Sequence, residues 1–116
     1  MLKFIDFENM SDAEVLDKIA SDYEVAPEKL AEVTILVAAQ YEGGYAGASW
    51  FLVRDNATGK LQIVDGGHCS CYGFEGQWEP DDTDVEYLLS DKFYACPLET
   101  SVIRPVLRQM NAEGAI

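Results

Sequence analysis

The first run of apolar residues recurs at the three- and four-residue spacing of a helix; it comprises Val15, Leu16, Ile19 and Tyr23. Directly before it, Ser11-Asp12-Ala13-Glu14 is a capping-box pattern, in which the serine and glutamate side chains each accept a hydrogen bond from a backbone amide at the helix start. We therefore predict a helix over about residues 11–22.

A short helical turn and a strand are expected next. Pro27 is suited to open a turn that runs through Ala31, because proline is tolerated at the first position of a helix. The β-branched residues that follow favour a strand over about residues 32–42. A helix that continues to Gln40 is the alternative interpretation.

Residues 48–55 are apolar at both alternating sets of positions, which is typical of a central strand with both faces buried. A turn-rich segment follows, and alternating apolar residues resume over about residues 61–66. We predict that these two strands form a hairpin and that Gly66 and Gly67 end it. Helices or a second copy of the chain would cover the apolar faces, so a homodimer is one expectation.

The last third of the chain predicts two helices. Thr83-Asp84-Val85-Glu86 is a second capping-box pattern and starts a helix over about residues 83–91. Residues 92–97 form a short strand or a loop, and a final helix runs over about residues 101–112 with Pro105 in its first turns. This order predicts an α+β fold, with a small antiparallel β-meander of about three strands packed with three helices that cover one face.

The length and composition are typical of a single globular domain. The chain has 116 residues, of which 48% are hydrophobic, so it can bury one core and we expect a single domain over residues 1–116. The longest purely apolar stretch, residues 35–39, is far shorter than the ~20 residues of a membrane span, and the first residues lack a secretory signal. Three cysteines, an odd number, fit a reducing compartment. The expected location is the cytoplasm.

Acidic side chains outnumber basic ones by 21 to 8, which gives a formal net charge of −13. This charge repels nucleic acids and anionic membranes, because nucleic-acid binding depends on Lys and Arg at the phosphates. The acids are unevenly placed: residues 1–32 hold nine acids and three bases, and residues 75–91 hold seven acids and no base. Charged partners are therefore expected to be basic.

A glycine-rich segment contains the only histidine and two of the three cysteines. Its sequence His68-Cys69-Ser70-Cys71-Tyr72-Gly73, followed by Glu75-Gly76-Gln77-Trp78-Glu79-Pro80, resembles a motif of small uncharacterised bacteriophage proteins. The resemblance covers about residues 44–90. It implies a phage origin and assigns no activity, so no functional residue is transferred from it.

The histidine and cysteines suggest several kinds of chemistry. His68, Cys69, Cys71 and Cys96 are the ligand types of a Cys3His zinc site, although in an extended strand Cys69 and Cys71 would lie about 7 Å apart. The alternatives are a cysteine nucleophile with His68 as base, and a redox bridge between Cys69 and Cys71 or to Cys96. The plainest interpretation is buried thiols and a histidine that hydrogen-bonds the loop backbone. No cofactor other than zinc is suggested.

The acidic segment after this motif is interpreted as a recognition surface. In this hypothesis the chain is a non-enzymatic phage accessory protein that binds and inhibits a host protein by occupying a basic nucleic-acid-binding surface, as an anti-defence or anti-CRISPR inhibitor would. Trp78, Tyr23 or Tyr87 would supply an aromatic anchor. A solvated loop and a calcium loop are the alternatives. The expected partner-binding residues are Glu75, Trp78, Glu79, Asp81, Asp82, Asp84 and Glu86.

Overall fold

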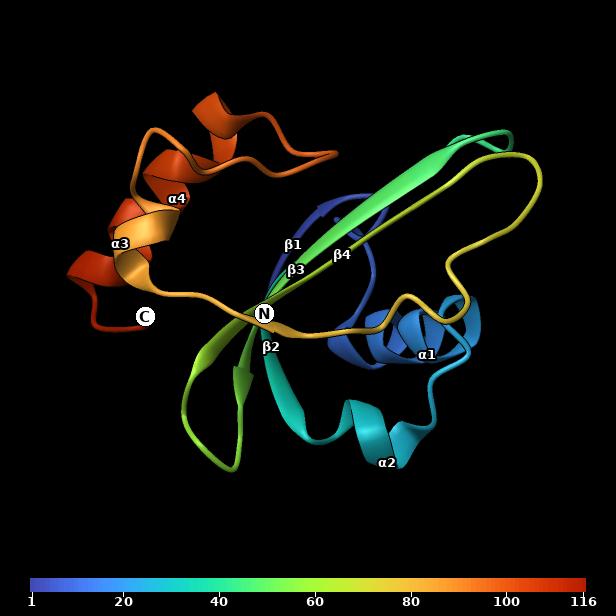
Figure 1. Ribbon diagram of the computed structural model, residues 1–116, viewed down its shortest axis with the longest axis horizontal. Helices are drawn as coiled ribbons and strands as arrows, with labels where there is room; N and C mark the ends of the chain where they lie inside the picture. Colours follow the sequence, from blue (N-terminus) through green and yellow to red (C-terminus); the bar gives the residue numbers. More distant parts are fainter.

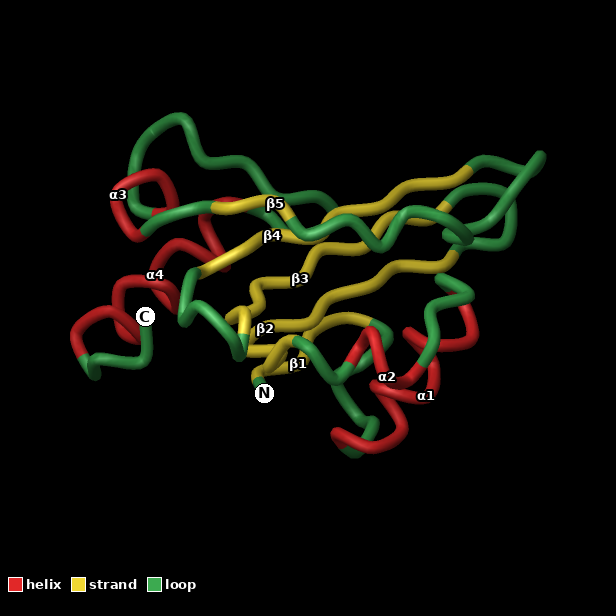
Figure 2. The backbone as a smooth tube through the Cα atoms, turned by 60° about the horizontal axis from the view of Figure 1, so that its bottom comes forward, coloured by secondary structure: helices red, strands yellow, loops and turns green.

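The computed structural model describes residues 1–116 as one five-stranded sheet with helices on both faces (Figure 1). The strands lie side by side in sequence order, as Figure 2 shows. The first pair is parallel and the other three pairs are antiparallel. The strands are β1 (Leu2–Ile5), β2 (Val33–Glu42), β3 (Gly47–Asp55), β4 (Leu61–His68) and β5 (Asp81–Asp82).

Four helices lie on the two faces of the sheet. They are α1 (Asp12–Asp22), α2 (Pro27–Leu30), α3 (Val85–Leu88) and α4 (Thr100–Ala112). In Figure 1 the helices α1 and α2 lie on one side of the sheet, and α3 and α4 lie on the other. No helix has the length and apolar character needed to cross a membrane.

The core on the α1 side is rich in aromatic rings. Phe51 of β3 contacts Phe7, Tyr23 and Trp78, with ring centroids 5.4–6.0 Å apart. Tyr23 stacks on Phe74 at 5.2 Å, so the segment after β4 is part of this core. The Tyr23 hydroxyl hydrogen-bonds with the buried Ser49. Burial raises the pKa of Tyr23 to about 12, so the phenol stays neutral.

The core on the opposite face is mainly aliphatic. Trp50 and Leu52 of β3 pack there with buried residues of α4, namely Ile103, Leu107 and Met110. Trp50 also meets Phe93 edge to face, at 5.7 Å between centroids. Because alternate residues of β3 enter different cores, each face of the sheet needs its own helical layer.

The fold class and the main elements agree with the sequence. The capping box at Ser11 and Glu14 is present, and its predicted helix forms as α1. The strands predicted at 32–42, 48–55 and 61–66 correspond to β2, β3 and β4, so the alternative helix to Gln40 is wrong.

Several predicted details are wrong. The short edge strands β1 and β5 were not anticipated, and helices cover both faces of the sheet instead of one. The helix predicted over 83–91 is only α3, with Asp84 instead of Thr83 as N-cap. For residues 92–97 the loop is confirmed and the alternative strand does not form.

Gly66 and Gly67 do not end the hairpin, because β4 continues through them to His68. Gly66 instead leaves room for a neighbouring ring. A Cβ atom on this residue would lie 2.5 Å from the Tyr23 hydroxyl oxygen and 3.2 Å from Phe74. The glycine thus permits close packing within the strand.

We expect Gly66→Ala to lower the free energy of unfolding by roughly 1–3 kcal/mol, because the buried Tyr23 and Phe74 would have to move. Gly67→Ala is the matched control. Its Cβ atom would meet only Gly47 O, at an ordinary 3.7 Å. Urea denaturation of the two variants measures the difference, and equal stability of both would contradict this account of Gly66.

Candidate functional site

His68 lies at the end of β4, where β2, β3 and β4 meet side by side. Its Nε2 atom is 2.6 Å from a carboxylate oxygen of Glu42, at the end of β2. Gly47 of β3 lies between the two residues, and a Cβ atom there would be 2.5 Å from Nε2. The imidazole also packs edge to face on Phe74, with 4.7 Å between centroids. These contacts leave the side chain of His68 only 5% exposed.

Both ring nitrogens of His68 face hydrogen-bond acceptors. Nδ1 lies 3.0 Å from the carbonyl oxygen of Cys69, and Nε2 faces the Glu42 carboxylate. Both contacts are satisfied at once only when the ring carries two protons. The Cys69 carbonyl, and then the hydrogen bond and charge of Glu42, accordingly raise the pKa of His68 above 6.5, against the opposing effect of desolvation.

Both ring nitrogens of His68 are therefore engaged, so a role as zinc ligand or as base would require one of these two contacts to break. The interpretation in which His68 hydrogen-bonds the loop backbone is confirmed by its contact with Cys69 O.

The three cysteines are free and exposed, so the interpretation as buried thiols is wrong. Cys69 and Cys71 follow the end of β4 in a turn, where the backbone amide of Cys71 donates to Cys69 Sγ at 3.5 Å. Cys96 lies in the loop between α3 and α4. The structure has no cluster of three or more His, Cys, Asp or Glu side chains suited to a metal. A zinc site made by His68 and the three cysteines stays a prediction, which elemental analysis of protein purified without chelator tests.

The expected aromatic anchors have different environments. Trp78 is 5% exposed and lies 5.4–5.5 Å from Phe51 and Tyr23 between ring centroids. Tyr23 is itself 1% exposed. Both rings belong to the core, so Tyr23 offers no exposed ring to a partner, and Trp78 as a partner-binding residue stays a prediction. Tyr87, on α3, is 39% exposed and is the remaining candidate.

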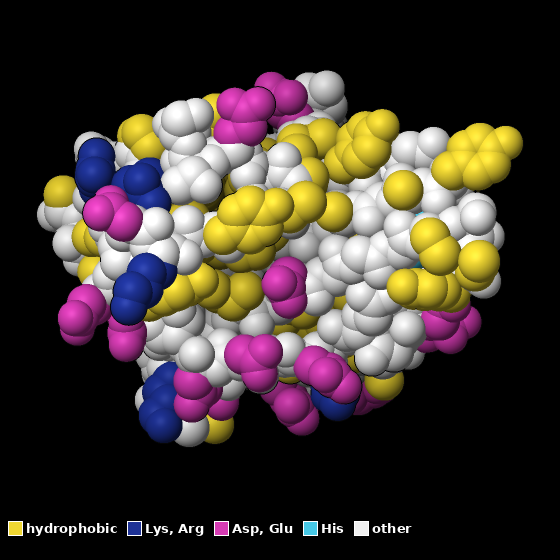
Figure 3. All heavy atoms as spheres, turned by 45° about the horizontal axis from the view of Figure 1, so that its top comes forward, with side chains coloured by type: hydrophobic (Ala, Val, Ile, Leu, Met, Phe, Trp, Pro, Cys, Tyr) yellow, Lys and Arg dark blue, Asp and Glu magenta, His cyan; other side chains and the backbone are white.

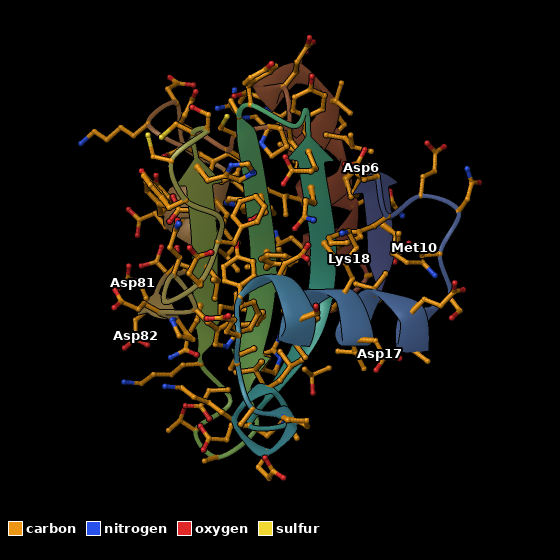
Figure 4. All side chains as sticks on the ribbon, turned by 90° about the vertical axis from the view of Figure 1, so that its right-hand side faces the viewer. Asp6, Met10, Asp17, Lys18, Asp81 and Asp82 are labelled. Atoms are coloured by element: carbon orange, nitrogen blue, oxygen red, sulfur yellow. The ribbon has the colours of Figure 1, made fainter.

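Tyr87 borders an acidic groove at the β4–β5 edge of the sheet. The groove has a volume of about 350 Å³, and Asp81 and Asp82 of β5 line it. Figure 4 shows these two residues on the edge of the sheet opposite to Asp6. The other lining residues are Ile63, Asp65, Thr83 and Asp84.

Positive charge compensates little of this groove. Lys60 Nζ lies 3.8 Å from Asp82, and both side chains are largely exposed. No lysine or arginine lies within 4.0 Å of Asp65, Asp81 or Asp84. Asp82 also accepts a hydrogen bond from Gln62 at 3.1 Å, and Asp84 caps α3 through the amide of Tyr87 at 2.8 Å. The groove therefore has a net negative charge, and hydrogen bonds hold the side chains of Asp82 and Asp84 in place.

The other predicted partner-binding acids do not line this groove. Glu75 accepts the Gly73 amide at 3.1 Å, and backbone hydrogen bonds, its own first, lower the pKa of its carboxyl. Glu79 lines a separate hollow with Tyr23 and Lys29. Glu86 is exposed in the first turn of α3. The predicted set thus divides among several surfaces.

The acids of the first segment are also separate from the groove. Asp12 pairs with Lys3 at 2.8 Å, and Asp22 pairs with Lys18 at 3.0 Å. In Figure 4 Asp17 lies on α1, away from Asp81 and Asp82. Acidic side chains occur on several sides of the face shown in Figure 3, with a dense group along its lower edge.

Sequence reasoning missed Asp65 as a member of the groove. This aspartate is two residues after Ile63 in β4, so both side chains point to the same face of the sheet. It is also paired with the buried Trp50 of β3. A charged residue at an otherwise apolar position of a strand was the available signal.

Family models, curated proteins and solved structures yield no match to this chain. The acidic groove combines carboxylates that have little positive charge nearby with the exposed ring of Tyr87.

His68 is the only histidine, so its ring protons report one titration by NMR. We expect a midpoint above 6.5, and a lower midpoint in Glu42→Gln, because that change removes the carboxylate charge. Glu86→Gln, on exposed α3, is the control and should leave the midpoint unchanged.

The same contact predicts a pH-dependent stability. Folding raises the pKa of His68. Its contribution to the free energy of unfolding is therefore complete below the pKa of the unfolded chain and is lost as pH rises through the pKa of the folded protein. Where His68 is protonated and Glu42 is ionised, Glu42→Gln should cost about 1 kcal/mol, the usual size of one hydrogen bond, and the cost should shrink at alkaline pH. Chemical denaturation across pH measures it. A wild-type NMR midpoint at or below 6.5 would contradict the ion pair.

Proposed function

We propose that the protein binds a basic surface of a host protein through the acidic groove at the β4–β5 edge, without bond-making chemistry. The observation that carries the proposal is the convergence of four carboxylates, one of them paired with a cation, beside Tyr87. They belong to Asp65, Asp81, Asp82 and Asp84.

Electrostatics favours association at this position. Uncompensated carboxylates attract lysine and arginine side chains over a distance comparable to the Debye length, about 8–10 Å at physiological salt, and this steering raises the association rate. Tyr87 and Ile63 add apolar area among the charges. A partly exposed tyrosine beside charged groups is a common energetic centre of protein interfaces.

The proposed partner is a protein whose basic surface normally holds nucleic acid. Carboxylates arranged along the sheet edge would then substitute for phosphates, and the formal charge of −13 keeps the chain itself away from nucleic acid. The resemblance to phage proteins supports an inhibitor of host defence, for instance of a CRISPR or restriction complex. Glu79 and Glu86 would act at the periphery of such an interface, and the small exposed part of Trp78 lines the same hollow as Glu79.

A charge-matched pair of triple variants tests the groove. The first carries Asp65→Asn, Asp81→Asn and Asp82→Asn, and leaves the Asp84 cap of α3 intact. The second carries Glu8→Gln, Asp17→Asn and Glu28→Gln, which are exposed and removed from the groove. Both lose the same charge, so net charge alone cannot distinguish them.

We expect the groove variant to bind a labelled arginine-rich peptide about tenfold more weakly than the wild type, and the control less than about threefold. Fluorescence polarisation at low and physiological salt measures both affinities. With a partner captured from bacterial lysate, duplex DNA should compete with the wild type for the same surface. If both variants lowered the affinity equally, the attraction would come from overall charge, and the groove would not be the binding site.

A further inference from the structure

The turn after β4 holds two cysteines on a short segment that is anchored at both ends. At its start, the Cys69 carbonyl accepts from Nδ1 of His68, whose ring is in turn held by Glu42. At its end, the Gly73 carbonyl accepts from Gln77 Nε2 at 2.9 Å. The backbone that carries Cys69 and Cys71 is thus positioned by the folded sheet.

Within this turn the two cysteines are neighbours in space. The Cys71 amide donates to Cys69 Sγ at 3.5 Å, so the Cys69 side chain folds back toward Cys71. Two residues of a turn have closer Cα atoms than the roughly 7 Å of an extended strand, and a disulfide requires about 4.4–6.8 Å. Both residues are exposed, so a reagent can reach either sulfur.

The surroundings of Cys69 favour its thiolate. Hydrogen bonds lower the pKa of the Cys69 thiol, first from the Cys71 backbone and its side chain, and then from the backbone of Cys69 itself and of Tyr72. A backbone amide that donates to the sulfur stabilises the thiolate relative to the thiol. The thiolate is the reactive form in disulfide exchange.

We propose that Cys69 and Cys71 form a redox-active dithiol that reacts with low-molecular-weight disulfides such as glutathione disulfide. The Cys69 thiolate attacks one sulfur of glutathione disulfide, whose S–S bond breaks and releases a glutathione thiolate. Cys71 then gives up its proton, attacks the Cys69 sulfur of the mixed disulfide and releases the second glutathione. The protein dithiol loses two electrons and two protons, and the disulfide gains them to become two glutathione thiols.

The roles of the two cysteines differ. Cys69 is the attacking residue because the Cys71 amide donates to its sulfur, and Cys71 is the resolving residue because it lies in the same turn. Cys96 provides an internal control. It is also exposed, but it lies in the loop between α3 and α4 and lines a hollow with Ala48 and Gly67.

The test uses the reduced full-length protein, glutathione disulfide near neutral pH, and N-ethylmaleimide to trap the thiols that remain. Trypsin cuts after Lys60 and Lys92, so one peptide holds both Cys69 and Cys71, and the next holds Cys96. We expect the first peptide to lose two hydrogens and escape alkylation while Cys96 is still alkylated.

Two variants separate the steps. In Cys71→Ser the mixed disulfide at Cys69 should accumulate, and in Cys69→Ser the oxidation of this turn should slow at least about threefold, since a more acidic thiol gains thiolate but loses some intrinsic reactivity. Circular dichroism confirms that each variant is folded. The proposal is overturned if glutathione reacts at similar rates with all three cysteines, or if no Cys69–Cys71 disulfide forms in the folded wild type.

Discussion

The burial of β3 on both faces is the constraint on which the rest of this structure depends. Phe51 and Val53 point into the aromatic core, and Trp50 and Leu52 point into the aliphatic core. A strand of this kind is stable only when apolar surface covers it from both sides. The chain supplies one layer before the central strands and the other layer after them, which explains why helices stand at both ends of the sequence.

Toward one end of the sheet, polar side chains pack over glycines of the central strands. Toward the end of β4, Gly66 lies beneath the Tyr23 hydroxyl, and His68 is held by the Glu42 carboxylate across Gly47. Small residues in the strands make room for polar side chains that cross over them. This end of the sheet is therefore held by the hydrogen bonds of His68, and the turn that carries Cys69 and Cys71 begins directly after it.

Local sequence patterns predicted the elements whose hydrogen-bond partners lie nearby in the sequence. Ser11 and Glu14 cap α1 as expected, since both partners lie within four residues. β1 and β5 depend on distant neighbours: Leu2 pairs with Val37, and Asp81 pairs with Ile63. No pattern within a strand of two or four residues carries such information. The Glu42–His68 contact and the place of Asp65 in the groove could not be predicted either, because both bring together residues that are distant in the sequence.

The position of the acids also matters for the sheet itself. An exposed edge strand invites pairing with other chains, and charged side chains on the edge prevent it. Asp81 and Asp82 on β5 have this effect whether or not a partner binds. Protection of a two-residue edge does not require Asp65, which lies in β4 beside the apolar Ile63 and faces the same groove. Because Asp65 is exposed and does not protect the edge strand, edge protection alone does not account for it, and it is the member of the groove that most supports the proposed recognition.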